Sequence, residues 1–266
     1  MGGRGHGSTV EIIATKRKRS VMSQSILRRA AAAAFALATA AVAQAGTLTT
    51  NGWLFGAGEA VKVAAPAYSG PAGGFSGTLS GMADERFNVG PLPMYCVDLG
   101  QTIDIRAGNA FSLGMAGDEA VSTFMLTPIE EVFDAEVAQR LGRLVSFASS
   151  DAAGVDDTAS SAALQLAIWN IVYDADGTLA AVAGSGFHDT HAAGGGRRAM
   201  ADGLLAASTG QAISKDVYVL VSTTRQDQLI WLDAASVPEP GSLALAGLAL
   251  AIVAGGGRRR VRARSR

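Results

Sequence analysis

Short runs of hydrophobic and aromatic residues, separated by glycine and proline, fill the first part of the central region of the chain. Runs of this length, rich in threonine and aromatic side chains and bounded by turn residues, are typical of β-strands. We therefore expect strands over residues 47–55, 74–79, 94–99 and 102–105. Turns are expected at Gly70-Pro71 and at residues 91–93.

The pattern changes after Pro128, where hydrophobic residues recur at the spacing of an α-helix. We expect one helix from residue 128 to about residue 145, with Glu130 and Glu131 in its first turn. A second helix is expected over residues 157–173; it is hydrophobic nearly all round and is therefore predicted to be buried. A weaker helix is expected over residues 197–207.

Two further strands, expected over residues 216–221 and 226–232, close this region. Strands, then a helical block, then strands predict an α+β domain with sandwich-like or barrel-like strands and helices inserted late. The domain is expected over residues 46–235, which is long enough for one domain or two small ones with a real core.

Opposite charges occupy different segments of the chain, although the formal net charge is only −1. Residues 1–45 hold seven basic residues and one acidic residue, and residues 237–266 hold six arginines and one acidic residue. The region between them has 9 basic and 21 acidic residues. Nucleic-acid binding needs clustered cations, so this acidic region argues against a nucleic-acid partner.

The N-terminal region from Met22 has the three parts of a secretory signal. Arg28 and Arg29 are followed by a short apolar stretch, and small residues stand at Ala43 and Ala45. Cleavage by signal peptidase is therefore expected before Gly46, which makes residues 1–45 the signal peptide. For residues 1–21 two interpretations stay open, an over-extended start with Met22 as the initiator and a long basic region of the signal.

The C-terminal region, residues 236–266, contains Pro238-Glu239-Pro240, an apolar run and an arginine cluster that includes Arg258, Arg259 and Arg260. The 17 residues 241–257 would span about 25 Å as a helix, the low end of what crosses a bilayer. The arginines after them are expected to stay cytoplasmic. Together these features resemble the PEP-CTERM sorting signal, in which a Pro-Glu-Pro motif, a transmembrane helix and an arginine-rich end follow one another.

This resemblance implies export through the inner membrane of a Gram-negative bacterium that makes exopolysaccharide. It also implies recognition by an exosortase, transient membrane insertion of the tail, cleavage near the motif, and release to the cell surface or extracellular matrix. An ordinary C-terminal membrane anchor is the alternative interpretation of the same residues.

Two residues of the central region stand out chemically. Cys96 is the only cysteine, so no disulfide can form within the chain. Gln165 is the main polar residue on the most apolar part of the helix predicted to be buried. An unpaired buried amide costs about 1–3 kcal/mol, so something must satisfy or consume this one.

The sequences Tyr95-Cys96-Val97 and Gln165-Leu166-Ala167-Ile168-Trp169 resemble two signatures of the thioester domain of bacterial surface adhesins. These signatures are an aromatic-Cys-hydrophobic triplet on a strand and a Gln-x-Ala-Ile-Trp block on a helix. The resemblance implies a bond between the Cys96 sulfur and the Gln165 carbonyl, formed with loss of ammonia. Tyr95, Val97, Ile168 and Trp169 are expected to surround that bond.

The chemistry expected from such a bond is a single covalent capture. A thiol held against a carboxamide gains effective molarity, and apolar neighbours such as Ile168 and Trp169 exclude water. A surface amine, or less easily a hydroxyl, would then attack the carbonyl. The expected function is covalent attachment in adhesion or biofilm formation, without turnover, so the chain is not expected to be an enzyme. No cofactor and no metal are expected.

The alternative is a structural matrix protein that binds exopolysaccharide noncovalently, with Cys96 buried as a free thiol and Gln165 bonded to backbone. His188-Asp189-Thr190-His191 could suggest a metal site, but no third ligand lies nearby in the sequence. We expect that tetrapeptide to be structural or solvated.

Overall fold

The computed structural model describes residues 46–116, 122–174, 176–180 and 186–234. All of them belong to one compact unit. The signal peptide predicted over residues 1–45 and the sorting tail predicted over residues 236–266 lie outside the described residues. Among the described residues, no helix is long and apolar enough to cross a membrane.

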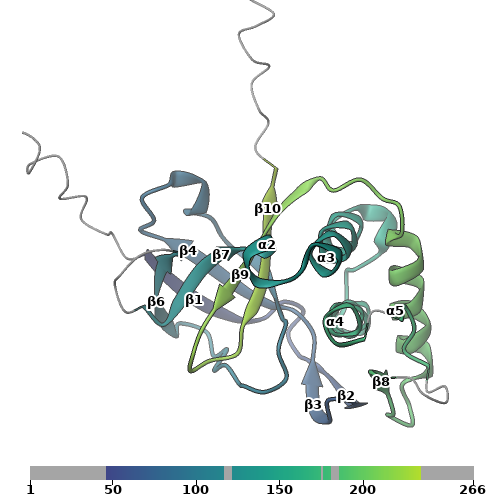
Figure 1. Cartoon of the computed structure of the whole chain (residues 1–266). Helices are drawn as coiled ribbons and strands as arrows, with labels where there is room; N and C mark the ends of the chain where they lie inside the picture. The colour runs from purple at the N-terminus through teal and green to yellow at the C-terminus, as the bar shows by residue number, and fades with distance from the viewer. Residues whose placement is uncertain (1–45, 117–121, 175, 181–185, 235–266) are drawn as a thin grey trace, which may run out of the picture. The chain divides into compact units, whose positions relative to one another are not determined.

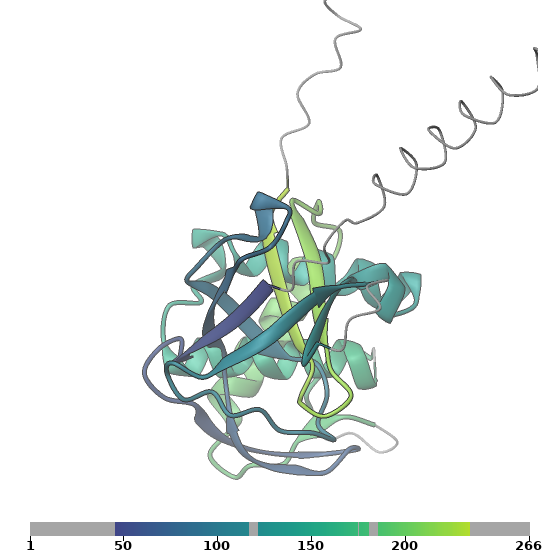
Figure 2. The ribbon, with the colours of Figure 1, turned by 90° about the vertical axis from the view of Figure 1, so that its left-hand side faces the viewer.

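Seven strands close into a barrel, which occupies one side of the domain (Figures 1 and 2). Adjacent strands pair antiparallel except β6 and β7, which run parallel. In the order in which they pair around the barrel, the strands are β1 (Gly46–Trp53), β4 (Phe75–Ser80), β5 (Leu92–Cys96), β10 (Gln228–Asp233), β9 (Lys215–Val221), β7 (Phe124–Pro128) and β6 (Ala110–Met115).

A separate three-stranded sheet stands beside the helices. β2 (Glu59–Ala64) lies between β3 (Tyr68–Ala72) and the two-residue strand β8 (His188–Asp189). The predicted turn at Gly70-Pro71 is wrong, because both residues belong to β3 and pair with Val61 and Ala60. β3 is an edge strand, where a proline costs no ladder hydrogen bond.

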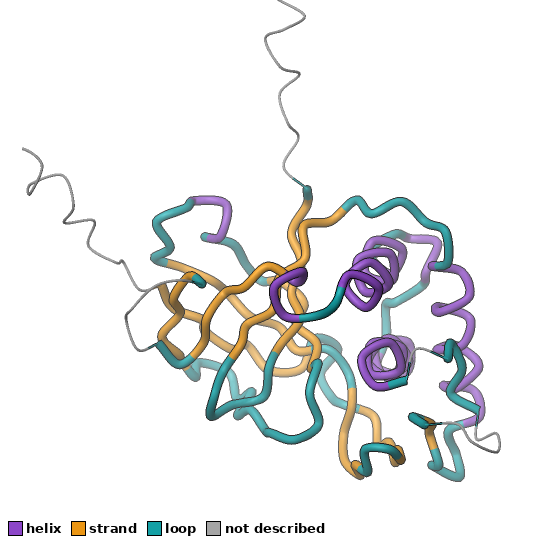
Figure 3. The backbone as a smooth tube through the Cα atoms, in the orientation of Figure 1, coloured by secondary structure: helices purple, strands orange, loops and turns teal. Residues whose placement is uncertain are grey.

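The helices gather on the other side of the domain (Figure 3). They are α2 (Ile129–Val132), α3 (Ala135–Ala148), α4 (Thr158–Tyr173) and α5 (Gly195–Ser208), with short 3₁₀ turns at Glu85–Phe87 and Asp151–Ala153. α4 packs against α3, α5 and β5, and residues 160–171 are all buried. The prediction of a buried second helix is thus confirmed, and the chain folds as a mixed α+β domain.

The helix predicted from residue 128 to 145 is in fact two helices. Phe133 adopts an extended conformation, and the Asp134 side chain accepts hydrogen bonds from the backbone N–H groups of Glu136 and Val137. This is an N-cap, which starts α3 afresh. The hydrophobic spacing is nearly continuous across the break and therefore does not reveal it.

The strand predicted over residues 102–105 is absent, because that segment is loop. The Asp104 carboxylate accepts from the backbone N–H of Arg106 at 3.1 Å. Such local side-chain bonding draws the backbone away from a sheet ladder. The loop is held against β1 by the Thr50 hydroxyl, which donates to the Arg106 carbonyl at 2.8 Å.

Candidate functional site

Cys96 is the last residue of β5, directly opposite Gln228, the first residue of β10. The Val97 N–H donates to the Asp227 carbonyl at 3.1 Å, which makes Cys96 and Gln228 a non-hydrogen-bonded pair. Side chains in such pairs are closer together than in hydrogen-bonded pairs and lie on the same face of the sheet. The register therefore sets the Cys96 thiol against the Gln228 carboxamide.

The Cys96 sulfur lies nearly equidistant from the two terminal atoms of that carboxamide. Gln228 Nε2 is 3.6 Å from the sulfur and Oε1 is 3.8 Å from it. Gln228 Nε2 also donates to the Gln226 carbonyl at 3.0 Å, which fixes the orientation of the amide. Cys96 is 4% exposed and Gln228 is fully buried, so both groups are shielded from bulk water.

Gln165 approaches the same cysteine from α4 but bonds to its backbone. Gln165 Oε1 accepts from the Cys96 N–H at 2.9 Å, and Nε2 donates to the Cys96 carbonyl at 2.7 Å. The ladder between β4 and β5 has already ended at Phe75 and Met94. The Gln165 amide thus takes the place of a neighbouring strand and satisfies both backbone groups of Cys96.

The sequence predicts a bond between the Cys96 sulfur and the Gln165 carbonyl, and the structure brings these two residues together. The two hydrogen bonds of the Gln165 amide go to the backbone N–H and carbonyl of Cys96. Gln228, which sequence reasoning missed, is the glutamine that contacts the sulfur. A polar residue at the start of a strand is unremarkable in the sequence, and only its register with Cys96 distinguishes it.

Burial raises the pKa of the Cys96 thiol far above its ordinary value. The negative charge of Asp98 adds to this rise, whereas the contact with Gln228 opposes it. The sulfur is therefore a protonated thiol at neutral pH, and it carries the proton that any acyl chemistry must move.

Asp98 joins the two strands just beyond the cysteine. Its Oδ2 accepts from the Asp227 N–H at 2.8 Å, and its backbone carbonyl accepts from Gln226 Nε2 at 2.8 Å. Its Oδ1 also accepts from the backbone N–H groups of Gly100 and Gln101, each at 2.9 Å. This clamp holds the end of β5 against the start of β10, and so it fixes the distance between Cys96 and Gln228.

Gln165, Trp169 and Tyr173 lie in one row along α4, because residues four apart share a helix face. Gln165 contacts the Cys96 backbone, and the Tyr173 hydroxyl accepts a hydrogen bond from the Leu99 N–H at 2.8 Å. Both ends of the row are thus tied to the short segment that carries Cys96. Trp169 stands between them and is 2% exposed.

Aromatic rings surround Trp169. Its ring centroid is 5.5 Å from that of Tyr68 on β3 and 6.4 Å from that of Phe187, and the Phe187 and Tyr173 rings stack at 6.1 Å. Burial raises the pKa values of Tyr68 and Tyr173, and Cys96 contributes to both shifts. The cluster of Tyr68, Trp169, Tyr173 and Phe187 is called the aromatic cluster below.

The other residues predicted around the bond have different positions. Tyr95 is adjacent to Cys96 on β5 and so faces the opposite side of the sheet, where its ring stacks on Trp231 at 5.8 Å. Its hydroxyl and the Ser161 hydroxyl are 3.0 Å apart. Val97 and Ile168 are both buried. Through Ser161, Tyr95 thus packs against α4 the face of β5 that is opposite to the Cys96 side chain.

The His188-Asp189-Thr190-His191 segment has a structural role in the fold. Asp189 is buried and pairs with the buried Arg197 of α5 at 3.0 Å, and Arg197 also lies 3.3 Å from Glu59 of β2. This ion cluster fastens β8 and β2 to α5. Within the described part of the chain, no group of three His, Cys, Asp or Glu side chains is placed to hold a metal ion.

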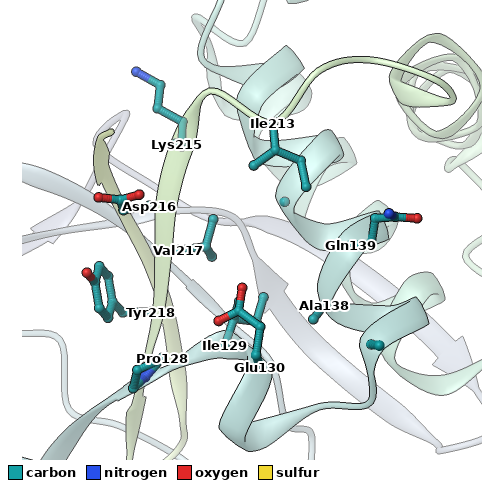
Figure 4. A pocket seen from close by; sticks show the side chains of 12 residues that line it. Pro128, Ile129, Glu130, Ala138, Gln139, Ile213, Lys215, Asp216, Val217 and Tyr218 are labelled. Atoms are coloured by element: carbon teal, nitrogen blue, oxygen red, sulfur yellow. The ribbon is translucent and has the colours of Figure 1, made fainter. Parts of the chain in front are cut away.

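A groove of about 390 Å³ opens between α2, α3 and β9 (Figure 4). None of its lining residues belongs to β5, β10 or α4. Asp216 and Tyr218 lie on one side of β9 and Val217 lies on the other, so the polar side chains do not converge on one point. The buried pair of Cys96 and Gln228 is therefore the better candidate site.

Residues 236–260 match the PEP-CTERM protein-sorting motif. The match includes Pro238, Glu239, Pro240 and the arginines 258–260, as predicted from the sequence. The chain is thus an exported protein that an exosortase sorts to the surface. No curated protein and no solved structure matches the chain.

Proposed function

We propose that this exported protein forms an internal thioester between Cys96 and Gln228, which it uses for one covalent attachment at the cell surface or in the extracellular matrix. One observation carries the proposal. A buried thiol lies 3.6 and 3.8 Å from the two terminal atoms of a buried carboxamide, in a register that backbone hydrogen bonds enforce.

Formation of the bond follows from this geometry. The Cys96 sulfur attacks the amide carbon of Gln228, a C–S bond forms, and the C–N bond breaks. The thiol proton passes to the departing nitrogen, which leaves as ammonia. Gln228 Nε2 is 3.6 Å from the sulfur, so proton donor and leaving group are already neighbours. An amide is otherwise inert, but fixed proximity supplies an effective molarity worth several kcal/mol.

Capture of a ligand is a second nucleophilic attack on the same acyl carbon. An amine nitrogen attacks the acyl carbon, the C–S bond breaks, and a proton from the amine returns to sulfur. The product is an amide that links the ligand to Gln228, with Cys96 restored as a thiol. A hydroxyl would give an ester by the same route. Each molecule reacts once, so the proposed activity is attachment in adhesion or biofilm formation and not turnover.

The surroundings support the lifetime that such a bond needs. Cys96 is 4% exposed and Gln228 is fully buried, and the Asp98 clamp holds their strands together. Exclusion of water protects a reactive acyl group from hydrolysis until a nucleophile enters.

The test is the intact mass of the domain without its signal peptide and tail. We expect a deficit of one ammonia, which methylamine converts to a gain of one methylamine on the thioester form. The variant Cys96→Ala should show the unmodified mass and no reaction with methylamine. A full mass together with a freely alkylatable thiol in freshly purified, unreacted protein would overturn the proposal.

Peptide mapping of the methylamine adduct decides which glutamine is the acyl partner. We expect the label on Gln228, because its carboxamide contacts the sulfur. Label on Gln165, the pairing predicted from the sequence, would contradict the assignment of the acyl group to Gln228. The matched variant Gln228→Ala should lack the mass deficit while retaining Cys96 and Gln165.

A noncovalent matrix protein that associates with exopolysaccharide is the second candidate. The buried free thiol of Cys96 favours it, since a thiol with a strongly raised pKa is poorly reactive as a nucleophile. The mass test separates the two, because this candidate predicts no loss of ammonia.

A further inference from the structure

The main-chain carbonyl of Gln226 accepts a hydrogen bond from the nitrogen that departs in the proposed formation of the thioester. Gln228 Nε2 donates to this carbonyl at 3.0 Å and lies 3.6 Å from the Cys96 sulfur. Among the described residues, neither the aromatic cluster nor any other group supplies a second donor to it. Gln226 is 8% exposed, so departure of the nitrogen leaves a shielded carbonyl without its donor.

This carbonyl cannot turn to find another donor, because hydrogen bonds hold the peptide that carries it. That peptide is planar, and its N–H belongs to Asp227, which donates to Asp98 Oδ2 at 2.8 Å. The Gln226 side chain donates to the Asp98 carbonyl at 2.8 Å, and the Gln226 N–H donates to the Thr102 carbonyl at 3.3 Å. The acceptor therefore stays aimed at the position that Gln228 Nε2 occupies.

Capture of an amine is the reverse of thioester formation with a different nitrogen, so the attacking nitrogen enters the position from which Gln228 Nε2 departed. The nitrogen bonds to the acyl carbon, the C–S bond breaks, and one N–H proton passes to the Cys96 sulfur. A primary amine has a second N–H, which can donate to the Gln226 carbonyl as Nε2 did. A secondary amine and a hydroxyl have a single proton, which the sulfur takes, so the carbonyl then faces an alkyl group or an oxygen lone pair.

We propose that the Gln226 main-chain carbonyl makes this protein selective for primary amines, because it holds the N–H that is not transferred to sulfur. The inference rests on the proposed thioester and narrows its ligand from amines and hydroxyls to one class. A buried site that accepts a hydrogen bond from its substrate rejects an analogue without the donor, since the acceptor is then left unpaired. For one hydrogen bond we expect this rejection to be on the order of 10- to 100-fold.

Ethylamine and dimethylamine test the proposal, because they are isomers that differ in the number of N–H protons and give adducts of the same mass. Each is added to the domain at an equal concentration of unprotonated amine, and capture is followed by intact mass. The ratio of the two rates is divided by the same ratio for a small acetyl thioester in the same buffer. We expect the quotient to favour ethylamine on the order of 10- to 100-fold. A quotient near one would overturn the proposal.

Isopropylamine separates the number of N–H protons from the size of the amine. It is bulkier than dimethylamine but has two N–H protons, so on the same scale it should react more like ethylamine than like dimethylamine. Rejection of isopropylamine as strong as that of dimethylamine would mean that size decides, and this outcome would also overturn the proposal.

The variant Gln226→Leu tests the residue itself. It removes the side-chain donor to the Asp98 carbonyl that helps to hold the peptide, so the ammonia deficit should still form while the preference for ethylamine falls. Ser146→Ala is the matched control, because it removes a hydroxyl of α3 that accepts from the Ser214 N–H at 2.9 Å, and neither residue carries a group of the site. It should leave the preference unchanged.

An undiminished preference in a folded Gln226→Leu would contradict the role of this carbonyl. If that variant does not fold, the comparison of amines on the unchanged domain decides by itself. Absence of the ammonia deficit in the unchanged domain would instead defeat the proposed function.

Discussion

Two buried glutamine side chains meet Cys96 from different elements, and their hydrogen bonds differ. Gln165 on α4 has both ends of its amide bonded to the Cys96 backbone, at 2.9 and 2.7 Å. Gln228 on β10 bonds through its nitrogen to the Gln226 carbonyl, while its oxygen has only the weak contact with the thiol. Burial is the same for both, so the hydrogen bonds decide their roles.

A satisfied amide holds a structure, whereas an incompletely satisfied one can react. The carbonyl oxygen of Gln165 accepts a strong backbone hydrogen bond and its nitrogen donates one, so attack on its carbon would sacrifice both. Attack on Gln228 sacrifices one bond, to Gln226, and removes an oxygen contact that is already long. Gln165 therefore positions the Cys96 nucleophile, and the carboxamide carbon of Gln228 is the atom that it attacks.

The largest expected difference between the two is chemical. Gln228→Ala should abolish the ammonia deficit and all labelling by methylamine, because the acyl group is gone. The free energy of unfolding should fall by only about 1 kcal/mol for the lost bond to Gln226, in addition to the cost of the smaller side chain. Mass spectrometry and urea unfolding check the two parts. A labelled product from Gln228→Ala would reverse the assignment of roles.

Gln165→Leu should show the opposite balance, with stability as the main loss. It leaves the N–H and the carbonyl of Cys96 buried without partners, which costs about 1–3 kcal/mol for each group. We expect the free energy of unfolding to fall by about 2–6 kcal/mol in urea.

Gln165→Glu is the matched control for that loss. Its carboxylate accepts from the Cys96 N–H but cannot donate to the carbonyl, so the loss should be intermediate and should shrink as the pH falls and the carboxyl becomes protonated. A loss below about 1 kcal/mol for Gln165→Leu would show that the backbone of Cys96 does not depend on α4.

The same contrast explains how much of the site could be predicted from the sequence. Gln165 was expected beside Cys96 because the two segments resemble the signatures of the thioester domain, and the structure brings the two residues together. Which atoms of Cys96 it meets depends on where the ladder between β4 and β5 ends, a nonlocal property. The position of Gln228 opposite Cys96 depends on the register of two strands more than 130 residues apart, which no local pattern encodes.

The elements of the fold likewise divide into those that local sequence signals predict and those that depend on pairing between strands. α4 was predicted almost to its ends, because the Asp157 cap and the apolar run are local signals. β2, β3, β6, β7 and β8 were missed, since each has only two to six residues and gains stability from pairing with other strands. Barrel closure likewise needs β6 to meet β1, which sequence periodicity cannot show.

A smaller effect concerns the pH dependence of stability. Burial raises the pKa of the Cys96 thiol in the folded state, so above pH 9.0, the ordinary value, the unfolded chain loses a proton that the folded domain keeps. Rising pH then favours unfolding by about 1.4 kcal/mol per pH unit. Gln228→Ala, which has the free thiol, should show this additional slope between pH 9 and 10 in urea titrations.

The control for the slope is the double variant with Cys96→Ala and Gln228→Ala. Tyrosines such as Tyr95, whose pKa burial raises to about 12, contribute equally to both proteins and cancel in the difference. The unchanged domain should behave like the double variant for as long as its thioester persists, because it has no free thiol. Equal slopes for Gln228→Ala and the double variant would mean that the thiol is solvated.

The smallest effect is expected on the other face of β5. Tyr95→Phe removes the hydroxyl that contacts Ser161 and keeps the ring that stacks on Trp231. The free energy of unfolding should fall by about 1 kcal/mol, the typical net value of one hydrogen bond. The ammonia deficit and the rate of methylamine capture should not change, because neighbouring residues on a strand face opposite sides of the sheet. A tenfold change in that rate would extend the reactive site through the strand, and the chemical difference between the two glutamines would then no longer follow from their own hydrogen bonds alone.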